Sequence, residues 1–368
     1  MATTTIDTTG ATTEGCRYCW MCRQACPVGH VTAREPHTPH AWALTIESVK
    51  RGQLTWNPET VELLYACADC GLCRAHCATD RPLPDAIAAA RAEVAAAGSA
   101  LPVVYDLDAR MKAHGNPYGP MAPAAAAAQG QTALFVGDAA HHLGASGLAA
   151  AMTLLEAAGV KPVTIAAGRS SGAMASSLGL ASTASTLATT LLQEVAATGC
   201  RELLVLTPGD KWAFTEVYPD RLGIAWPENV KVIEVTTVLG EALADGRLTF
   251  KAASDVPAYA YHDPCHSPRI DRDSGTARRL LAAALGKDGA RQLFWREGRA
   301  HPCGATSGLE FTQPAIAARL ADARIADAKA AGAKWLVTED PACLHQLGQS
   351  GAPDLQVRGL YELLAAQL

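Results

Sequence analysis

Three features that would point directly to a broad function class are missing from this sequence. It contains no dense run of lysine or arginine, and its formal net charge is -5 over 368 residues. No uninterrupted apolar segment approaches the roughly 18 to 20 residues that cross a bilayer. Residues 1–15 have neither a basic nor an apolar region, so they do not resemble a secretory signal. These absences argue against nucleic-acid partners and a membrane span, and they predict a soluble, cytoplasmic protein.

Cysteine, by contrast, is plentiful, with twelve residues in the chain. In a reducing compartment, cysteines at regular spacing are more often metal ligands than disulfide partners. The length exceeds what one hydrophobic core usually supports, so we expect two or three compact domains. The spacing of the cysteines therefore becomes the main guide to function.

Two cysteine runs near the N-terminus share the spacing C-x2-C-x2-C-x3-C. The first run is Cys16, Cys19, Cys22 and Cys26, followed by Pro27, and the second is Cys67, Cys70, Cys73 and Cys77. This spacing is typical of two [4Fe-4S] clusters, in which the fourth cysteine of each run binds the other cluster. We therefore expect Cys77 to complete the first cluster and Cys26 the second. Structural zinc is the competing interpretation, but zinc sites usually pair two separated C-x2-C elements.

The segments between and around these runs predict helices. Residues 40–51 and 58–66 have helical character, and the second begins with Pro58 behind Asn57 as its cap. We expect a disordered tail over residues 1–14 and a helical ferredoxin-type domain over residues 15–116. The aromatic residues Tyr18, Trp20, Trp56 and Tyr65 are expected to pack in the core or to shield the clusters.

The remaining two thirds of the chain alternate short β-rich runs with Ala- and Leu-rich helical segments. An Ala- and Pro-rich linker over residues 117–131 separates this region from the first. Strands are predicted at residues 133–136, 162–166, 202–207, 230–235, 258–262 and 334–338. Such alternation predicts α/β layers with mostly parallel sheets, and an α+β fold for the whole chain.

This region repeats itself. The segments GDAAH, SSG and TPGDKW, at residues 137–141, 170–172 and 207–212, align with HDPCH, PCG and EDPACL, at residues 262–266, 302–304 and 339–344. The last two pairs share one offset, because 303 - 171 and 343 - 211 both equal 132. Each aligned segment follows a predicted strand, where open α/β sheets bind ligands. The second copy carries three cysteines there, Cys265, Cys303 and Cys343, and the first copy carries Ala140, Ser171 and Lys211.

With these motifs the chain resembles the iron-sulfur subunits related to heterodisulfide reductase and to the glycolate oxidase iron-sulfur subunit. The elements YHDPCHSPR (261–269), PCG (302–304) and TEDPAC (338–343) are similar to those of the duplicated cysteine-rich CCG domain in that family. The resemblance implies a CCG-like repeat without cysteine ligands over residues 132–250 and a second repeat with three cysteines over residues 251–368.

The chain also departs from the family pattern, in which an intact CCG domain supplies five cysteines. Pro302 and Asp340 stand at two of the cysteine positions, so a noncubane disulfide-reducing cluster is not expected. Cys265, Cys303, Cys343 and Asp340 are the candidate ligands of a third cluster. A [3Fe-4S] cluster, a zinc site completed by one imidazole or carboxylate, and a site that has lost its metal remain open alternatives. The histidines close in sequence are His262, His266, His301 and His345.

The resemblance implies a non-autonomous electron-transfer subunit of an oxidoreductase complex. It would relay electrons between a flavoprotein dehydrogenase and an acceptor such as electron-transfer flavoprotein, ferredoxin or a quinone-linked carrier. No G-x-G-x-x-G stands in a strand-turn-helix context, so flavin or nicotinamide is expected on a partner. A catalytic thiol or disulfide reductase, with its centre at the three C-terminal cysteines, is the alternative. The first repeat is expected to be a docking surface near Ser170 and Lys211, or a purely structural unit, and Cys200 a buried apolar residue.

Overall fold

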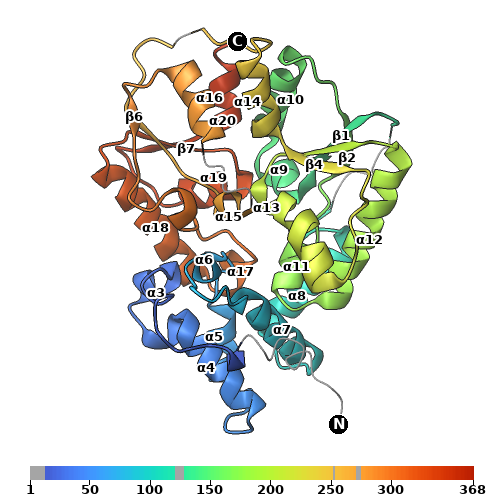
Figure 1. The fold of residues 1–368 in the computed structure, drawn as a ribbon, viewed down its shortest axis with the longest axis vertical. Coiled ribbons are helices and arrows are strands. Elements are labelled where there is room, and N and C mark those ends of the chain that lie inside the picture. Colours follow the sequence, from blue (N-terminus) through green and yellow to red (C-terminus); the bar gives the residue numbers. More distant parts are fainter. Residues whose placement is uncertain (1–12, 121–127, 252, 271–274) are drawn as a thin grey trace.

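The computed structural model of the chain describes residues 13–120, 128–251, 253–270 and 275–368. Most of the predicted tail and residues 121–127 of the predicted linker lie outside the described residues. The fold is α+β, as the sequence predicts, with a helical N-terminal part followed by two α/β units. In Figure 1 the N-terminal helices lie below the two α/β units, which stand side by side.

The helical N-terminal part confirms both predicted helices, which become α4 and α5. Its elements are α3 (Pro27–Thr32), the 3-10 turn η1 (Glu35–His37), α4 (Pro39–Lys50), α5 (Pro58–Tyr65), α6 (Leu72–Ala75), α7 (Leu83–Ala96) and α8 (Pro102–His114). Asn57 caps α5 by accepting a hydrogen bond from the backbone N–H of Thr60, whose side chain accepts one from the Asn57 backbone N–H. This reciprocal cap satisfies two donors that the first helical turn leaves without partners, so α5 begins where the sequence predicts.

The first α/β unit, called the first repeat below, contains a four-stranded parallel sheet in the order β2-β1-β3-β4. Its strands are β1 (Thr132–Val136), β2 (Val163–Ala167), β3 (Glu202–Val205) and β4 (Lys231–Glu234). Its helices are α9 (Gly137–Leu143), α10 (Ala145–Ala157), α11 (Ala173–Ser177), α12 (Ala181–Thr198), α13 (Pro208–Trp212), the π-helix η2 (Ala213–Arg221) and α14 (Val235–Ala244). All four strands fall within or close to the predicted runs.

The second α/β unit, the second repeat, contains a parallel sheet in the order β6-β5-β7-β8. Its strands are β5 (Tyr259–Tyr261), β6 (Ala290–Arg291), β7 (Trp335–Thr338) and β8 (Gln356–Gly359). The other elements are α15 (Ser267–Ile270), α16 (Thr276–Leu285), the 3-10 turn η3 (Glu297–Arg299), α17 (Leu309–Thr312), α18 (Pro314–Ala330), α19 (Pro341–Gly348) and α20 (Leu360–Ala365). The sequence did not predict β6 or β8. Both are short edge strands without a buried apolar face, so neither carries the hydrophobic pattern that reveals a strand.

The two sheets have the same strand order, which supports the internal repeat. Two aligned glycines give a second sign of it. Gly172 and Gly304, which end SSG and PCG, have φ angles of +85° and +106°. At each position an added Cβ would meet a backbone carbonyl of the following long helix, that of Ala184 or of Ala317. Only glycine fits both the left-handed backbone and this close approach.

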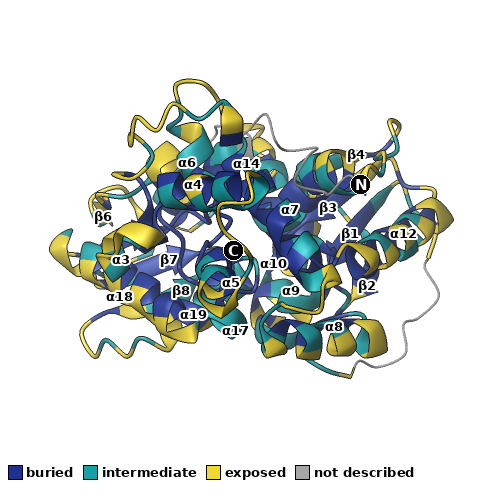
Figure 2. Ribbon diagram, turned by 90° about the horizontal axis from the view of Figure 1, so that it is seen from below, coloured by how far each residue is buried: buried dark blue, intermediate teal, exposed yellow. Residues whose placement is uncertain are grey.

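The two repeats share one hydrophobic core. Helices α10 and α14 of the first repeat pack on α20 and α16 of the second, and this core contains Leu134, Leu204, Leu280 and Leu360, all buried. Figure 2 shows the strands buried between helices whose outer faces are exposed. No described helix combines the length and apolar character needed to cross a membrane.

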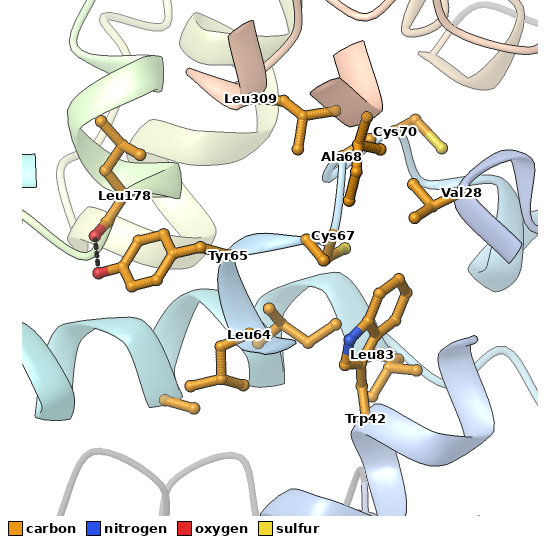
Figure 3. Packing of buried hydrophobic residues seen from close by; sticks show 14 of the residues in the cluster. Val28, Trp42, Leu64, Tyr65, Cys67, Ala68, Cys70, Leu83, Leu178 and Leu309 are labelled. Carbon is orange, nitrogen blue, oxygen red and sulfur yellow. Dashed lines mark hydrogen bonds between the residues drawn. The ribbon is translucent and has the colours of Figure 1, made fainter. Parts of the chain in front are cut away.

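The N-terminal part packs against both repeats through a separate core. Figure 3 shows Tyr65 and Cys67 of this part beside Leu178 of the first repeat and Leu309 of the second. The Tyr65 hydroxyl donates a 3.0 Å hydrogen bond to the backbone carbonyl of Leu178. The same core includes Cys70 and Cys265. The second cysteine run of the N-terminal part and the first cysteine of the second repeat therefore lie in the same packed core.

Candidate metal centres

The first group of cysteines lies at the molecular surface. Cys16, Cys19, Cys22 and Cys77 line one cavity of about 270 Å³, and Cys73 also reaches it. Cys19 is exposed. The intervening Tyr18 and Trp20 have φ angles of +47° and +64°, a backbone conformation that residues other than glycine rarely adopt. This loop curls tightly, so that its three thiols face the same cavity.

Three of the four cysteines in the second group are buried, and Cys73 is half-buried. Cys26, Cys67 and Cys70 are 5%, 7% and 8% exposed. Burial raises the pKa of all three, that of Cys67 to about 12. Neighbouring thiols act in the same direction, and for Cys70 this neighbour is Cys265 of the C-terminal site. Burial raises the pKa of Cys73 well above its usual value too, and the charges of Cys67, Cys70 and Cys26 act in the same direction.

These two groups are the ones that the predicted wiring requires. Cys77 lies with the first run, and its charge acts on Cys22. Cys26 lies with the second run, and charges on Cys67 and Cys70 act on it. The assignment of individual ligands stays a prediction, but the thiols fit it chemically. With their pKa raised by burial, these thiols hold their protons, and a bound cluster would stabilise the thiolates and release those protons.

The three C-terminal cysteines are buried and face one cavity. Cys265, Cys303 and Cys343 are 7%, 1% and 6% exposed and line a cavity of about 130 Å³. Cys303 lies directly before Gly304, whose close approach to α18 fixes its position, and Cys343 lies in the first turn of α19. The sulfurs of Cys303 and Cys343 are 2.9 Å apart, and a ring nitrogen of His262 lies within 4.8 Å of both. These donors suit an iron-sulfur cluster or zinc.

Asp340, the fourth candidate ligand, has a structural role that its sequence position did not reveal. It is the N-cap of α19, and its Oδ1 accepts hydrogen bonds from the backbone N–H groups of Ala342 and Cys343. The residue also lines the cavity that contains the three thiols. Its role as a cluster ligand stays a prediction. The helix cap is a second reason for an aspartate at this position.

The first repeat forms the opposite wall of that cavity. Asp138, Ser170, Ser171 and Asp210 line it. Ser170 and Ser171 are 3% and 5% exposed, so the expectation of an exposed docking surface near Ser170 is wrong. The strand ends of the two repeats face each other, and this arrangement buries the first repeat's serines against the second repeat's thiols.

Sequence reasoning missed the carboxyl groups of this wall. Burial raises the pKa of Asp210 to about 7, helped by the charge of Asp138. On the other side of the cavity, burial raises the pKa of Glu310, in α17 of the second repeat, to about 7. Asp138 and Asp210 occur in GDAAH and TPGDKW, so the repeat alignment placed them at strand ends. They stand two residues before Ala140 and one before Lys211, the positions that align with Cys265 and Cys343.

A ring of contacts around Asp69 joins the three parts of the molecule. Asp69 lies between Cys67 and Cys70, and Arg221 of the first repeat forms two hydrogen bonds with its carboxylate, at 2.7 and 2.9 Å. Arg221 lies over the ring of Trp212, which stacks on His266 at 4.2 Å. His266 closes the ring by donating to the Asp69 backbone carbonyl at 3.2 Å.

This ring is buried, and its ion pair is strong. Burial raises the pKa of Asp69, but the charge and hydrogen bonds of Arg221 outweigh that effect and hold it below the usual value. The backbone beside Cys70 is thereby fixed against the residue that follows Cys265. The second cysteine group and the C-terminal site are adjacent in a rigid part of the fold.

The aromatic residues separate into two sets. Tyr65 is fully buried, as expected, but Trp20 is 57% exposed and Tyr18 is 36% exposed. The expectation of core packing is therefore wrong for Trp20. Cys200 is 2% exposed in the apolar core of the first repeat, so its predicted burial is confirmed.

Comparisons with known proteins agree with this geometry. Residues 12–81 match a 4Fe-4S dicluster domain, and residues 259–348 match a cysteine-rich domain of the CCG type. The fold is similar to the crystal structure of a hypothetical protein from Helicobacter pylori, with a TM-score of 0.59 and 14% sequence identity. That alignment covers 90% of this chain and 67% of the other. No curated protein matches the chain significantly.

The ferredoxin-type domain and the cysteine-rich domain together define an iron-sulfur protein. More specifically, this pair of domains matches an iron-sulfur subunit of the heterodisulfide reductase type. The expected family resemblance is thus confirmed. The fold likeness to the H. pylori protein concerns architecture alone.

Proposed function

We propose that the chain relays single electrons between a flavoprotein dehydrogenase and an acceptor such as electron-transfer flavoprotein, ferredoxin or a quinone-linked carrier. Two [4Fe-4S] clusters, bound by the two N-terminal cysteine groups, carry the electrons, and a third centre at Cys265, Cys303 and Cys343 lies next in line. An iron-sulfur electron-transfer role is supported by the two matched domains.

The surface around the first cysteine group supports docking of a redox partner. Trp20 and Met21 are 57% and 55% exposed beside the exposed thiol of Cys19. Arg17 and Arg23 are exposed in the same loop. Aromatic residues, methionine and arginine are the types enriched where proteins bind each other. A partner with an acidic rim around its cofactor would suit this loop.

One observation carries the proposal: the buried cysteine group contacts the C-terminal site. Cys70 and Cys265 share one core, and the charge of Cys265 acts on Cys70. His266, next to Cys265, donates a hydrogen bond to Asp69, next to Cys70. The cysteine groups therefore follow one another from the surface to the interior, as a relay requires.

The relay is tested by anaerobic stopped-flow reduction with photoreduced flavodoxin, a small acidic electron donor. We expect the clusters to bleach in successive phases, and Cys19→Ser to slow every phase because electrons enter at the exposed group. Cys200→Ser is the matched control. Unchanged reduction of the interior centres in Cys19→Ser would contradict entry through the surface cluster.

The cavity between the repeats favours a second candidate function. Its three thiols face Asp138 and Asp210 across about 130 Å³, so a small disulfide substrate would meet both thiols and proton donors. If the chain is such a reductase, the isolated chain should reduce a disulfide with reduced methyl viologen as electron donor and without a partner protein. The relay predicts little turnover without a partner.

A further inference from the structure

Of the four histidines near the C-terminal cysteines, His262 is the one that the described residues group with Cys303 and Cys343. His266 lies at the third thiol, with its Nδ1 4.0 Å from the sulfur of Cys265. His262 follows β5, is 0% exposed, and has a ring nitrogen within 4.8 Å of the sulfurs of Cys303 and Cys343. Two roles fit this position. The ring could bind a metal ion through nitrogen, or it could donate an N–H hydrogen bond to sulfur.

Arg324 on α18 distinguishes between these roles. Its Nε donates a 3.4 Å hydrogen bond to Nδ1 of His262, and the guanidinium is 1% exposed. An arginine side chain has donors and no acceptor. Nδ1 must therefore carry a lone pair, which places the ring proton on Nε2.

The remaining nitrogen is then a buried donor. Within the described residues, Nε2 of His262 has no hydrogen-bond partner, whereas buried polar groups are nearly always paired. A histidine that binds a metal usually donates its other N–H to a carboxylate or carbonyl, which orients the ring. Arg324 offers no such acceptor to Nδ1. The surroundings of the ring therefore favour the donor role over the ligand role.

Arg324 also brings a buried positive charge to the site. One guanidinium nitrogen pairs with Asp327 at 2.8 Å, a second is buried without a partner among the described residues, and the charge acts on Cys303. Hydrogen bonds to sulfur and nearby positive charge both stabilise the more negative, reduced form of an iron-sulfur cluster. No comparable cation or histidine lies at the aligned position of the first repeat, where GDAAH begins with Gly137.

We propose that His262 is an N–H donor to the sulfurs of the centre held by Cys303 and Cys343, and that His262 and Arg324 together raise its reduction potential. Arg324 is a positioning residue, because it fixes the tautomer of His262. The inference rests on the third centre of the proposed function. Reduction adds one electron, supplied by the preceding cluster, and the Nε2–H bond stays intact. The C-terminal centre then becomes the electron sink of the relay.

The test is a redox titration of the anaerobically purified full chain, followed by electron paramagnetic resonance, with iron and zinc analysis of each sample. His262→Leu removes the donor, His262→Gln keeps an N–H donor on a side chain of similar reach, and His345→Leu removes an exposed histidine two residues from Cys343. We expect equal iron in all four proteins. In His262→Leu alone, the midpoint potential of the third centre should fall by about 59 mV, a tenfold change in its one-electron equilibrium.

Other outcomes overturn the inference. Loss of the third centre's iron in both His262 variants, but not in His345→Leu, would make His262 a ligand. An unchanged midpoint potential of the third centre in His262→Leu would show that His262 does not raise it. If His262→Leu does not fold, pulsed resonance on the wild type decides, because a strong coupling to a directly bonded ¹⁴N contradicts the donor role. A wild type with no third iron centre overturns the inference and leaves the two-cluster relay standing.

Discussion

The two α/β repeats share a strand order and differ in what stands at the strand ends. In the second repeat these ends carry Cys265, Cys303 and Cys343, and in the first they carry hydroxyl and carboxyl groups. Gly172 and Gly304 keep the same left-handed turn in both. The turn and the sheet therefore do not depend on a bound cluster, because the first repeat forms both without cysteines at the aligned positions.

The first repeat supplies the buried ion pairs to the N-terminal part, which also packs on α17 and α18 of the second repeat. Arg221 pairs with Asp69 and Asp85, and the backbone carbonyls of Ser177 and Leu178 accept hydrogen bonds from Arg91 and Tyr65. The second repeat carries three thiols, and the first adds a buried ion pair and hydrogen bonds to the N-terminal part. The two repeats therefore share one scaffold and differ in the side chains that it carries.

The largest expected effect comes from breaking the buried ion pair. Arg221→Met leaves the buried carboxylate of Asp69 without its ion-pair partner, which typically costs about 3 to 5 kcal/mol of stability. We expect a large fall in the thermal midpoint of the anaerobic, cluster-loaded chain, measured by calorimetry. Arg201→Met, at an exposed arginine of the same repeat, is the matched control.

A double variant sharpens this prediction. Asp69→Asn combined with Arg221→Met removes both charges, so part of the lost stability should return. If Arg221→Met alone changes the midpoint no more than Arg201→Met does, the first repeat does not clamp the N-terminal part through this pair.

A smaller effect is expected from the carboxyl wall of the first repeat. The folded chain holds the proton of Asp210 up to a pKa of about 7, against a usual value of 3.8. The folded state then binds more protons between pH 4 and 7, so this group makes stability fall as pH rises through that range. Asp210→Asn should flatten the dependence and gain up to roughly 4 kcal/mol at pH 7.5.

The measurement is the thermal midpoint of Asp210→Asn and wild type at pH 5 and pH 7.5. Asp106→Asn, at an exposed carboxyl of α8, is the control. A gain at pH 7.5 that is no larger than the gain at pH 5 would contradict a buried, protonated Asp210.

The smallest effect on stability is expected at the surface loop of the first cysteine group. Trp20 is largely exposed and touches only the ring of His40 among the described aromatic rings, so Trp20→Ala should cost less than about 1 kcal/mol. The rate at which photoreduced flavodoxin reduces the Trp20→Ala protein should nevertheless fall about tenfold, because exposed aromatic residues at an interface often carry binding energy. Phe294→Ala, at an exposed aromatic residue outside this loop, should leave the rate unchanged. Equal rates in the two variants would remove Trp20 from the docking surface.

Much of the architecture could be predicted from sequence because its signals are local. The cap at Asn57 and the alternation of apolar runs are properties of neighbouring residues, and the offset of 132 exposed the repeat. The short edge strands β6 and β8 lacked such a signal. Their pairing depends on a neighbouring strand that is distant in sequence.

The site was predictable in its thiols and not in its surroundings. Regular spacing identified the eight N-terminal cysteines, and alignment identified Cys303. The facing wall with Asp138 and Asp210 depends on how the two sheets oppose each other, which no local pattern encodes. The same holds for Arg324, a single arginine on a long helix whose partner His262 lies 62 residues away.

We propose a metal centre in the second repeat and none in the first. Iron and sulfide analysis of the anaerobically purified chain tests this difference, on the wild type, Cys303→Ser and Ser171→Ala. We expect about twelve iron atoms per wild-type chain, four for each of three cubanes, about eight in Cys303→Ser, and about twelve in Ser171→Ala. About eight iron atoms in all three proteins would contradict it.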